Sequence, residues 1–166
     1  MQGFLGMAAF VATCAGIVWV RNLFWKAAKQ KVLDRKDRAR GQSAIKSQMA
    51  FVIPAIGASD VIRTVVAGLG YPTTKPAQAA AMVLIGATDC QAAFALANKF
   101  GQTWESRLSV VDGPDGAHGD YEVVRWTMSD GVASGWEEMQ ILQRRVGEIA
   151  TGIGGTVKVT VPVTGH

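Results

Sequence analysis

An apolar stretch near the amino terminus, Gly3–Val20, reads GFLGMAAFVATCAGIVWV. These eighteen residues contain no charged side chain, and Arg21 is the first charge that follows them. At about 1.5 Å of rise per residue, such a helix is roughly 27 Å long, close to the ~30 Å hydrocarbon core of a bilayer. The stretch therefore predicts a single transmembrane helix, and this prediction shapes the interpretation of the remaining chain.

Two alternatives to a retained membrane span stay open. A cleaved secretory signal would carry basic residues before a shorter apolar run, whereas here they come after it. A buried helix of a soluble protein usually has a polar face, and this stretch offers only Thr13 and Cys14. Small residues at four-residue intervals either allow a second membrane helix to pack closely or simply reflect how common Ala and Gly are in membrane spans. These residues are Ala8, Ala12 and Gly16.

Basic residues are concentrated immediately after the apolar stretch. Residues 21–46 contain nine basic and two acidic side chains, a net charge of +7, whereas residues 47–166 carry a net charge of −3. Lys and Arg beside a span stay on the cytoplasmic side. We therefore expect the amino terminus outside and the large C-terminal part in the cytoplasm, or in an equivalent compartment such as a mitochondrial matrix or a virion interior.

This basic neck is also expected to contact anionic lipid headgroups, at about 1 kcal/mol per basic residue near the surface. The alternative is that the charges only set topology and solvate the neck. Nucleic acid is an unlikely partner because no aromatic residues interleave with the basic ones. The side chains expected at the lipid surface are Arg21, Lys26, Lys29, Lys31, Arg35, Lys36, Arg38 and Arg40.

Length and composition indicate one folded domain behind the anchor. The chain has 166 residues, 49% hydrophobic and 18% charged, which is typical of a packed chain. Two cysteines, Cys14 and Cys90, provide no disulfide framework. The expected organisation is an anchor over 1–25, a basic neck over 26–48, an apolar segment with a helix and linker over 49–76, and a folded domain over 77–166.

Hydrophobic periodicity assigns the elements of the folded part. Val61, Ile62, Val65, Val66 and Leu69 form one face of a helix that begins after Ser59. Ser134 and Glu137 have the spacing of a capping box before the strongest amphipathic pattern, Met139, Leu142, Val146, Ile149 and Ile153. The predicted order from residue 77 is strand 80–87, helix 90–100, strands 107–112 and 121–128, helix 134–153 and strand 156–163.

That order, βαββαβ, is the split unit of a ferredoxin-like plait. The sequence therefore predicts an α+β fold, with a transmembrane helix followed by a plait whose helices cover one face of a four-stranded sheet. Two segments stay ambiguous. Residues 77–97 could instead be helical or form a second membrane segment, and residues 49–70 could pack on the domain or rest on the membrane.

Few residues suggest chemistry. His118 and His166 have no Cys or His neighbour at metal-ligand spacing, and no nucleotide-binding or hydrolase motif occurs. Asp112, Asp115, Asp120 and His118 could hold a hard cation loosely, but turn composition explains them better. Cys90 is interpreted as a structural cysteine rather than a reactive one. We therefore expect no catalytic, cofactor or metal site.

An anchor, a packed domain and no convergent polar site together predict a non-catalytic structural or accessory subunit of a membrane assembly. Respiratory, secretion and virion membrane complexes all fit this description. The expected partners are other membrane-protein subunits, with homo-oligomerisation as a further option. The alternative is a membrane-tethered regulatory or ligand-sensing domain, because plait folds often bind small molecules; that argument is an analogy from fold.

Overall fold

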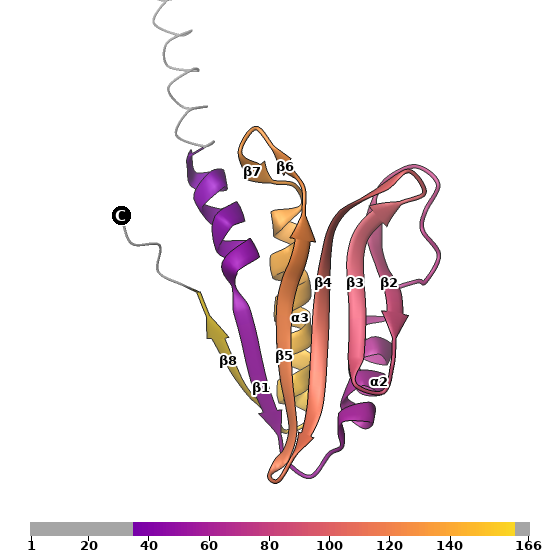
Figure 1. Ribbon diagram of the computed structural model, residues 1–166, viewed down its shortest axis with the longest axis vertical. Coiled ribbons are helices and arrows are strands. Elements are labelled where there is room, and N and C mark those ends of the chain that lie inside the picture. Colours follow the sequence, from indigo (N-terminus) through magenta and orange to yellow (C-terminus); the bar gives the residue numbers. More distant parts are fainter. Residues whose placement is uncertain (1–34, 162–166) are drawn as a thin grey trace, which may run out of the picture. The chain divides into compact units, whose positions relative to one another are not determined.

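A six-stranded antiparallel sheet dominates the computed structural model, which describes residues 35–161 (Figure 1). Its strand order is β2-β3-β4-β5-β1-β8. The strands are β1 (Gln48–Ile53), β2 (Ala81–Ala87), β3 (Gln91–Asn98), β4 (Gly101–Gly113), β5 (Gly116–Trp126) and β8 (Thr156–Thr160). Beside the sheet lie helices α2 (Ala58–Leu69) and α3 (Trp136–Gly152) and a small hairpin of β6 (Met128–Ser129) and β7 (Val132–Ala133).

Strands β2 to β5 follow one another as a meander because tight turns separate them. In the β3–β4 turn, Asn98 Oδ1 accepts hydrogen bonds from the amides of Phe100 and Gly101 at 2.9 and 3.0 Å. In the β4–β5 turn, Gly116 has φ +132°, a conformation that favours glycine. Local turn chemistry therefore positions the four strands on one side of the sheet.

Strand β1 enters from outside this meander and pairs with strands distant in sequence. Met49 lies opposite Tyr121 of β5 on one side and opposite Val159 of β8 on the other. Because β1 is central, its alternate residues Met49, Phe51 and Ile53 are buried. The apolar segment after residue 48 thus belongs to the core of the domain.

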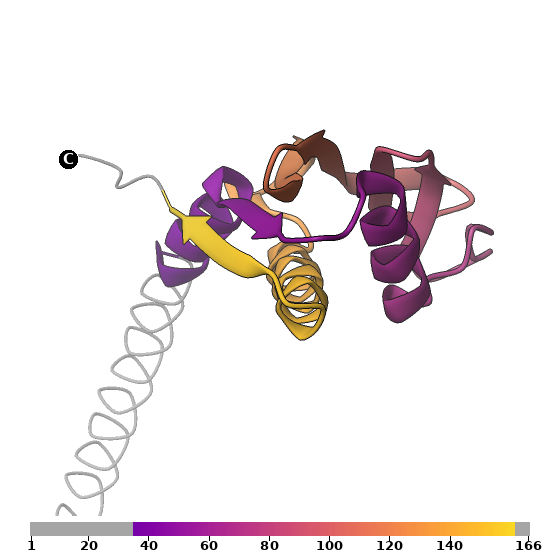
Figure 2. The same ribbon diagram turned by 90° about the horizontal axis from the view of Figure 1, so that it is seen from below.

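Helices α2 and α3 cover the same face of the sheet (Figure 2). Helix α2 buries Val61, Val65 and Leu69, and α3 buries Met139, Leu142 and Val146. The two helices also contact each other. Arg145 of α3 lies over the ring of Tyr71, in the linker just after α2, and donates to the Tyr71 hydroxyl at 3.2 Å. The opposite face of the sheet carries no helix among residues 35–161 and is called the open face below.

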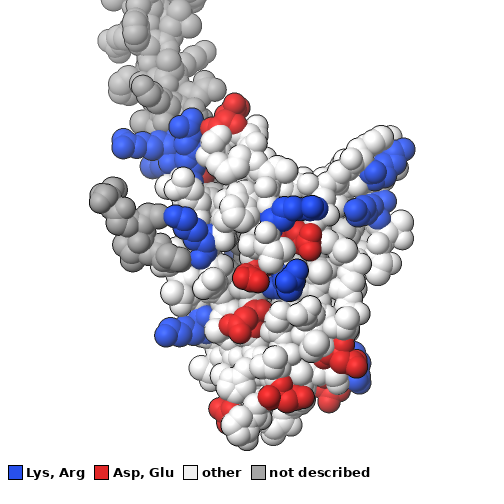
Figure 3. Space-filling view, in the orientation of Figure 1, with Lys and Arg blue, Asp and Glu red and all other residues white. Residues whose placement is uncertain are grey.

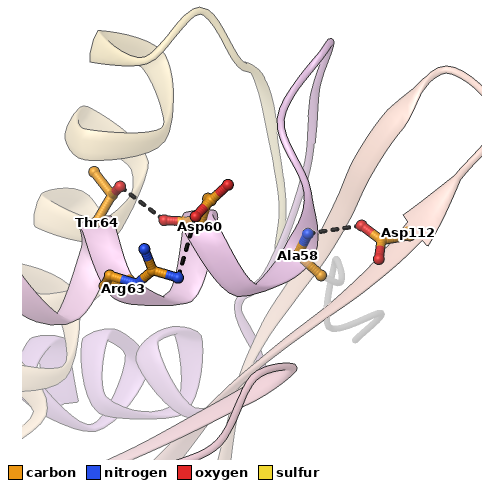
Figure 4. A network of polar contacts seen from close by, with 5 residues as sticks. All are labelled: Ala58, Asp60, Arg63, Thr64 and Asp112. Atoms are coloured by element: carbon orange, nitrogen blue, oxygen red, sulfur yellow. Dashed lines mark hydrogen bonds and ion pairs between the residues drawn. The ribbon is translucent and has the colours of Figure 1, made fainter.

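A side chain from β4 caps the amino terminus of α2 (Figure 4). The local N-cap residue is Gly57, which has no side chain to accept a hydrogen bond. Instead, Asp112 Oδ1 accepts the Ala58 amide at 2.6 Å. A carboxylate here satisfies one free amide and interacts favourably with the positive end of the helix dipole. Asp112 therefore connects the β4–β5 turn region to α2.

Replacing Asp112 with alanine is expected to lower the free energy of unfolding by about 1 kcal/mol, the usual effect of losing an N-cap acceptor. Equilibrium urea unfolding followed by circular dichroism measures this change. Asp112→Asn keeps an acceptor oxygen and should lose less than half as much. An Asp112→Ala variant as stable as the parent would show that the contact contributes nothing to α2.

The ferredoxin-like plait is wrong, chiefly because the predicted helix 90–100 is a strand. Strand β3 spans Gln91–Asn98 and pairs along its length with both β2 and β4. Its alanines favour a helix by intrinsic propensity, but Ala92, Phe94 and Leu96 alternate onto the helix-covered face. Two-sided strand pairing outweighs that propensity, and the sheet gains a strand where the plait requires a helix.

The predicted helices at 59–69 and 134–153 are confirmed as α2 and α3, but the capping box is not. Helix α3 begins after Gly135, which has φ +69° and no side-chain cap hydrogen bond. A Cβ at Gly135 would lie 2.6 Å from Leu96 Cδ2, so glycine is needed for close packing on the sheet. The ambiguity over 49–70 and 77–97 is also resolved, because these residues form β1, α2, β2 and β3 within the domain.

The expectation of a single-pass membrane protein is corrected. Gly3–Val20, the stretch that carried it, lies outside the described residues. Within residues 35–161 every helix is too short or too polar to cross a bilayer. Helix α2 has 12 residues, and α3 carries the charges of Glu137, Glu138, Arg144, Arg145 and Glu148. The predicted membrane location and the topology with the domain on the cytoplasmic side are corrected with it, since no described helix supports a span.

A candidate interaction edge

Strand β8 forms one edge of the sheet and pairs only with β1 among the described strands. Its outer side therefore presents backbone amides and carbonyls to which no described strand is joined. Such an edge is a template for pairing with another chain, and proteins usually shorten, charge or cover it. The outer edge of β8, together with Val161, is called the β8 edge below.

The side chains of the β8 edge divide by face. Val157 and Val159 lie opposite Phe51 and Met49, on the face that the helices cover. Val157 packs against the core, but Val159 is 52% exposed and Val161 is 47% exposed. Thr156, Lys158 and Thr160 point to the open face. The edge thus combines free backbone groups with valines that the domain itself does not cover.

A shallow hollow of about 220 Å³ adjoins the β8 edge on the open face. Its lining includes Thr160 of β8, Gln48 and Ala50 of β1, and two carboxylates of β5, Asp120 and Glu122. Ala50 lies between Asp120 and Lys158 in the strand register. The hollow therefore offers negative charge within reach of a cation placed beyond Thr160.

Elsewhere on the open face, acidic and basic side chains are interspersed (Figure 3). Glu105 lies opposite Arg125, with 3.9 Å between their charged atoms, and Arg107 lies opposite Glu122. Glu105 also accepts a hydrogen bond from Gln102 at 2.9 Å. Cross-strand pairs of this kind are typical of a solvated surface. The open face alone therefore gives no concentrated site of one charge.

The opposite edge of the sheet is less accessible. Strand β2 forms that edge, but the amide of Leu84 donates to Pro72 O at 2.9 Å, so the linker after α2 occupies part of it. The same linker is joined to the β3–β4 turn through Lys99 N and Pro76 O, at 2.9 Å. Of the two sheet edges, only the β8 edge lacks a neighbouring segment among residues 35–161.

The residues expected to contact lipid fall into three groups: some lie outside the described residues, some are exposed, and some pack on the domain. Arg21, Lys26, Lys29 and Lys31 lie outside the described residues, as do the predicted membrane-packing residues Ala8, Ala12 and Gly16. Arg35 and Lys36 are exposed on a helical segment over 35–46. Arg40 lies over the Trp136 ring at 6.0 Å, and Arg38 lies beside Gly131. The last two side chains therefore pack on the domain.

The acidic cluster around the β4–β5 turn has local explanations. Asp112 caps α2, and Asp120 points to the open face. His118 Nε2 donates to Asp115 Oδ1 at 2.6 Å, and this hydrogen bond lowers the pKa of Asp115. No group of three potential ligands suited to a metal ion occurs among residues 35–161. Cys90 is free and exposed in the β2–β3 turn, not at the start of a helix.

Comparison with known proteins identifies no relative, since no family model, curated protein or solved structure matches this chain. The β8 edge therefore has to be interpreted from its own chemistry. Sequence reasoning recognised the alternating strand at 156–163 but not its edge position. The strict alternation of valines indicates a strand with one buried face, but it carries no signal of the strand's place in the sheet.

Proposed function

We propose that this chain is a non-catalytic structural or accessory subunit that assembles with other protein chains through the β8 edge. The observation that carries the proposal is a sheet edge that pairs with no further strand among residues 35–161 and is flanked by half-exposed valines. Recognition by strand addition uses these two features, with backbone hydrogen bonds for affinity and alternate side chains for specificity. The predicted class of protein, a non-catalytic structural or accessory subunit, is retained, but attachment to a membrane is no longer part of it.

The energetics support pairing at this edge. Fully burying a valine side chain is worth about 1.5 kcal/mol or more, so covering the exposed halves of Val159 and Val161 contributes roughly 1–2 kcal/mol together. Each backbone hydrogen bond formed adds about 0.5–1.5 kcal/mol. Lys158 is the only charge on the strand and discourages indiscriminate pairing. A specific partner must therefore accommodate one cation on the open-face side.

Native mass spectrometry of the full-length chain, purified under mild conditions, tests this proposal. We expect an assembly of fixed composition in which more than one protein chain is present. Val159→Lys places a second charge on the edge and should dissociate the assembly. Val111→Lys is the matched control, because Val111 is 60% exposed on β4 and lies away from the edge. A wild-type chain that is monomeric and partner-free would contradict the proposal.

The acidic hollow beside β8 is the observation behind one alternative function, a domain that senses a small organic cation. The small size of the hollow counts against this alternative. Its volume of about 220 Å³ is below the roughly 300–1,000 Å³ of typical ligand pockets. A thermal-shift screen with organic cations distinguishes the two functions. Stabilisation that disappears in Asp120→Asn but persists in Asp115→Asn would support ligand sensing, since a ligand that binds only the folded state raises its stability.

A further inference from the structure

We propose that the partner at the β8 edge is a second copy of this chain, paired antiparallel to the first about a twofold axis at Val159. This inference rests on the proposed function, because it names the occupant of the same edge. The two sheets would then join into one continuous sheet across the axis. Isologous pairing of this kind closes after two copies and leaves no further β8 edge free.

Strand chemistry restricts the register. Residues directly opposite in an antiparallel pair lie on the same face, so odd-numbered residues must oppose odd-numbered ones when both helix-covered faces are on one side. An axis at Lys158 would place the two lysines opposite each other, which is unfavourable. An axis at Val157 would leave Val161 beyond the end of the partner strand. These two registers therefore fit the edge poorly.

An axis at Val159 gives favourable cross-strand pairs on both faces of the joined sheet. Val159 then opposes Val159 of the second copy, and Val157 opposes Val161, so the two half-exposed valines of each copy are covered. On the open face, Lys158 opposes Thr160 of the second copy rather than another lysine. Four of the five residues of β8 are β-branched, a composition that favours paired strands. Of the axes at Val157, Lys158 and Val159, only the axis at Val159 covers both valines and keeps the two lysines apart.

Charge complementarity supports the same register. Thr160 lines the acidic hollow with Asp120 and Glu122. A lysine opposite Thr160 extends its ammonium group toward that hollow, within the roughly 8–10 Å over which charges interact at physiological salt. Each copy would therefore supply one Lys158 to the carboxylates of the other. The only charge on β8 would then lie beside a threonine and toward carboxylates rather than beside a second lysine.

Disulfide cross-linking of the full-length chain tests the register, in a background in which Cys14→Ser and Cys90→Ser remove the native thiols. Opposite residues in an antiparallel pair have Cα atoms about 4.5–5.5 Å apart, which suits a disulfide. Val159→Cys is expected to form a covalent dimer under mild oxidation. Its rate should exceed that of Val111→Cys about a hundredfold, the ratio of a millimolar effective concentration to about 10 μM protein.

A second pair of variants makes the test specific. Lys158→Cys and Thr160→Cys should each form no covalent dimer when oxidised alone, and a mixture of the two should form a covalent heterodimer. Circular dichroism confirms that each variant is folded. Self-cross-linking of Lys158→Cys, or a Val159→Cys rate equal to that of Val111→Cys, would overturn the proposed dimer.

The proposed function and the second-copy inference fail separately. If native mass spectrometry shows an assembly with a different protein that Val159→Lys dissociates, strand addition at the β8 edge holds and the second copy is the wrong partner. If Val159→Lys changes no assembly at all, both fail. A wild-type dimer that Val159→Lys dissociates and Val111→Lys does not, with cross-links in the expected register, supports both.

Discussion

Replacing Trp104 with alanine is expected to lower the free energy of unfolding by about 3–5 kcal/mol, the range for removing a fully buried aromatic side chain. Trp104 is 0% exposed and lies opposite Leu96 of β3 and Trp126 of β5. A Cβ at Gly135 would lie 2.8 Å from Trp104 Nε1, so the start of α3 packs directly on the indole. Urea unfolding followed by far-ultraviolet circular dichroism measures the loss.

Two further variants control for the Trp104 result. Trp104 Nε1 makes no hydrogen bond within the described residues, so Trp104→Phe loses packing only and should cost about 1–2 kcal/mol. Trp126 is 41% exposed, and Trp126→Ala should cost less than half as much as Trp104→Ala. Equal losses at Trp104 and Trp126 would contradict the placement of Trp104 at the centre of the core.

A methyl group at Gly119 is expected to destabilise the domain by about 3 kcal/mol, at the upper end of the overpacking range. Gly119 lies on the helix-covered face of β5 directly opposite Phe51, and a Cβ built on it overlaps the Phe51 ring. The ring cannot withdraw easily because Phe51 is only 2% exposed within the core. The Gly119→Ala variant should therefore unfold at a markedly lower urea concentration.

Gly86→Ala is the matched control for this overpacking. Gly86 lies in β2, beside an irregularity in the pairing with β3, and a Cβ there meets nothing within 4 Å. Alanine restricts the unfolded chain more than glycine does, so the variant should be neutral or more stable by up to about 1 kcal/mol. If Gly119→Ala were as harmless as Gly86→Ala, Phe51 would not occupy the position that the structure gives it.

Amphipathic patterns were sufficient to predict the two helices of the domain. Val61, Val65 and Leu69 in α2, and Leu142 and Val146 in α3, recur at helical spacing, and all are buried. The strand at 156–163 was equally clear from its strict alternation, and β8 confirms it over Thr156–Thr160. These elements carry their signal within a short window of sequence.

The sheet could not be predicted because its arrangement depends on distant partners. Strand β3 has an alanine-rich sequence whose helical propensity is overcome only by pairing with β2 on one side and β4 on the other. Strand β1 ends just before Pro54, and its central position requires contacts with β5 and β8 across the whole domain. Neither the pairing of β3 nor that of β1 produces a recognisable pattern in the neighbouring sequence.

The candidate site was missed for a related reason. The exposure of Val159 and Val161 follows from the edge position of β8, and alternation alone does not distinguish an edge strand from a central one. The remote cap of α2 is similar, because Asp112 is 54 residues from Ala58 in the sequence. Arg40 of the basic neck, a predicted lipid contact, packs on Trp136 instead.

Amide hydrogen exchange over residues 156–161 tests most directly whether another chain pairs with the β8 edge. About half of the amides of an edge strand point outward and exchange rapidly unless a partner strand accepts them. We predict slow exchange over this segment in the assembled wild-type chain and in Val111→Lys, and fast exchange in Val159→Lys. Equally fast exchange in all three proteins would show that the edge is unoccupied and would contradict assembly through β8.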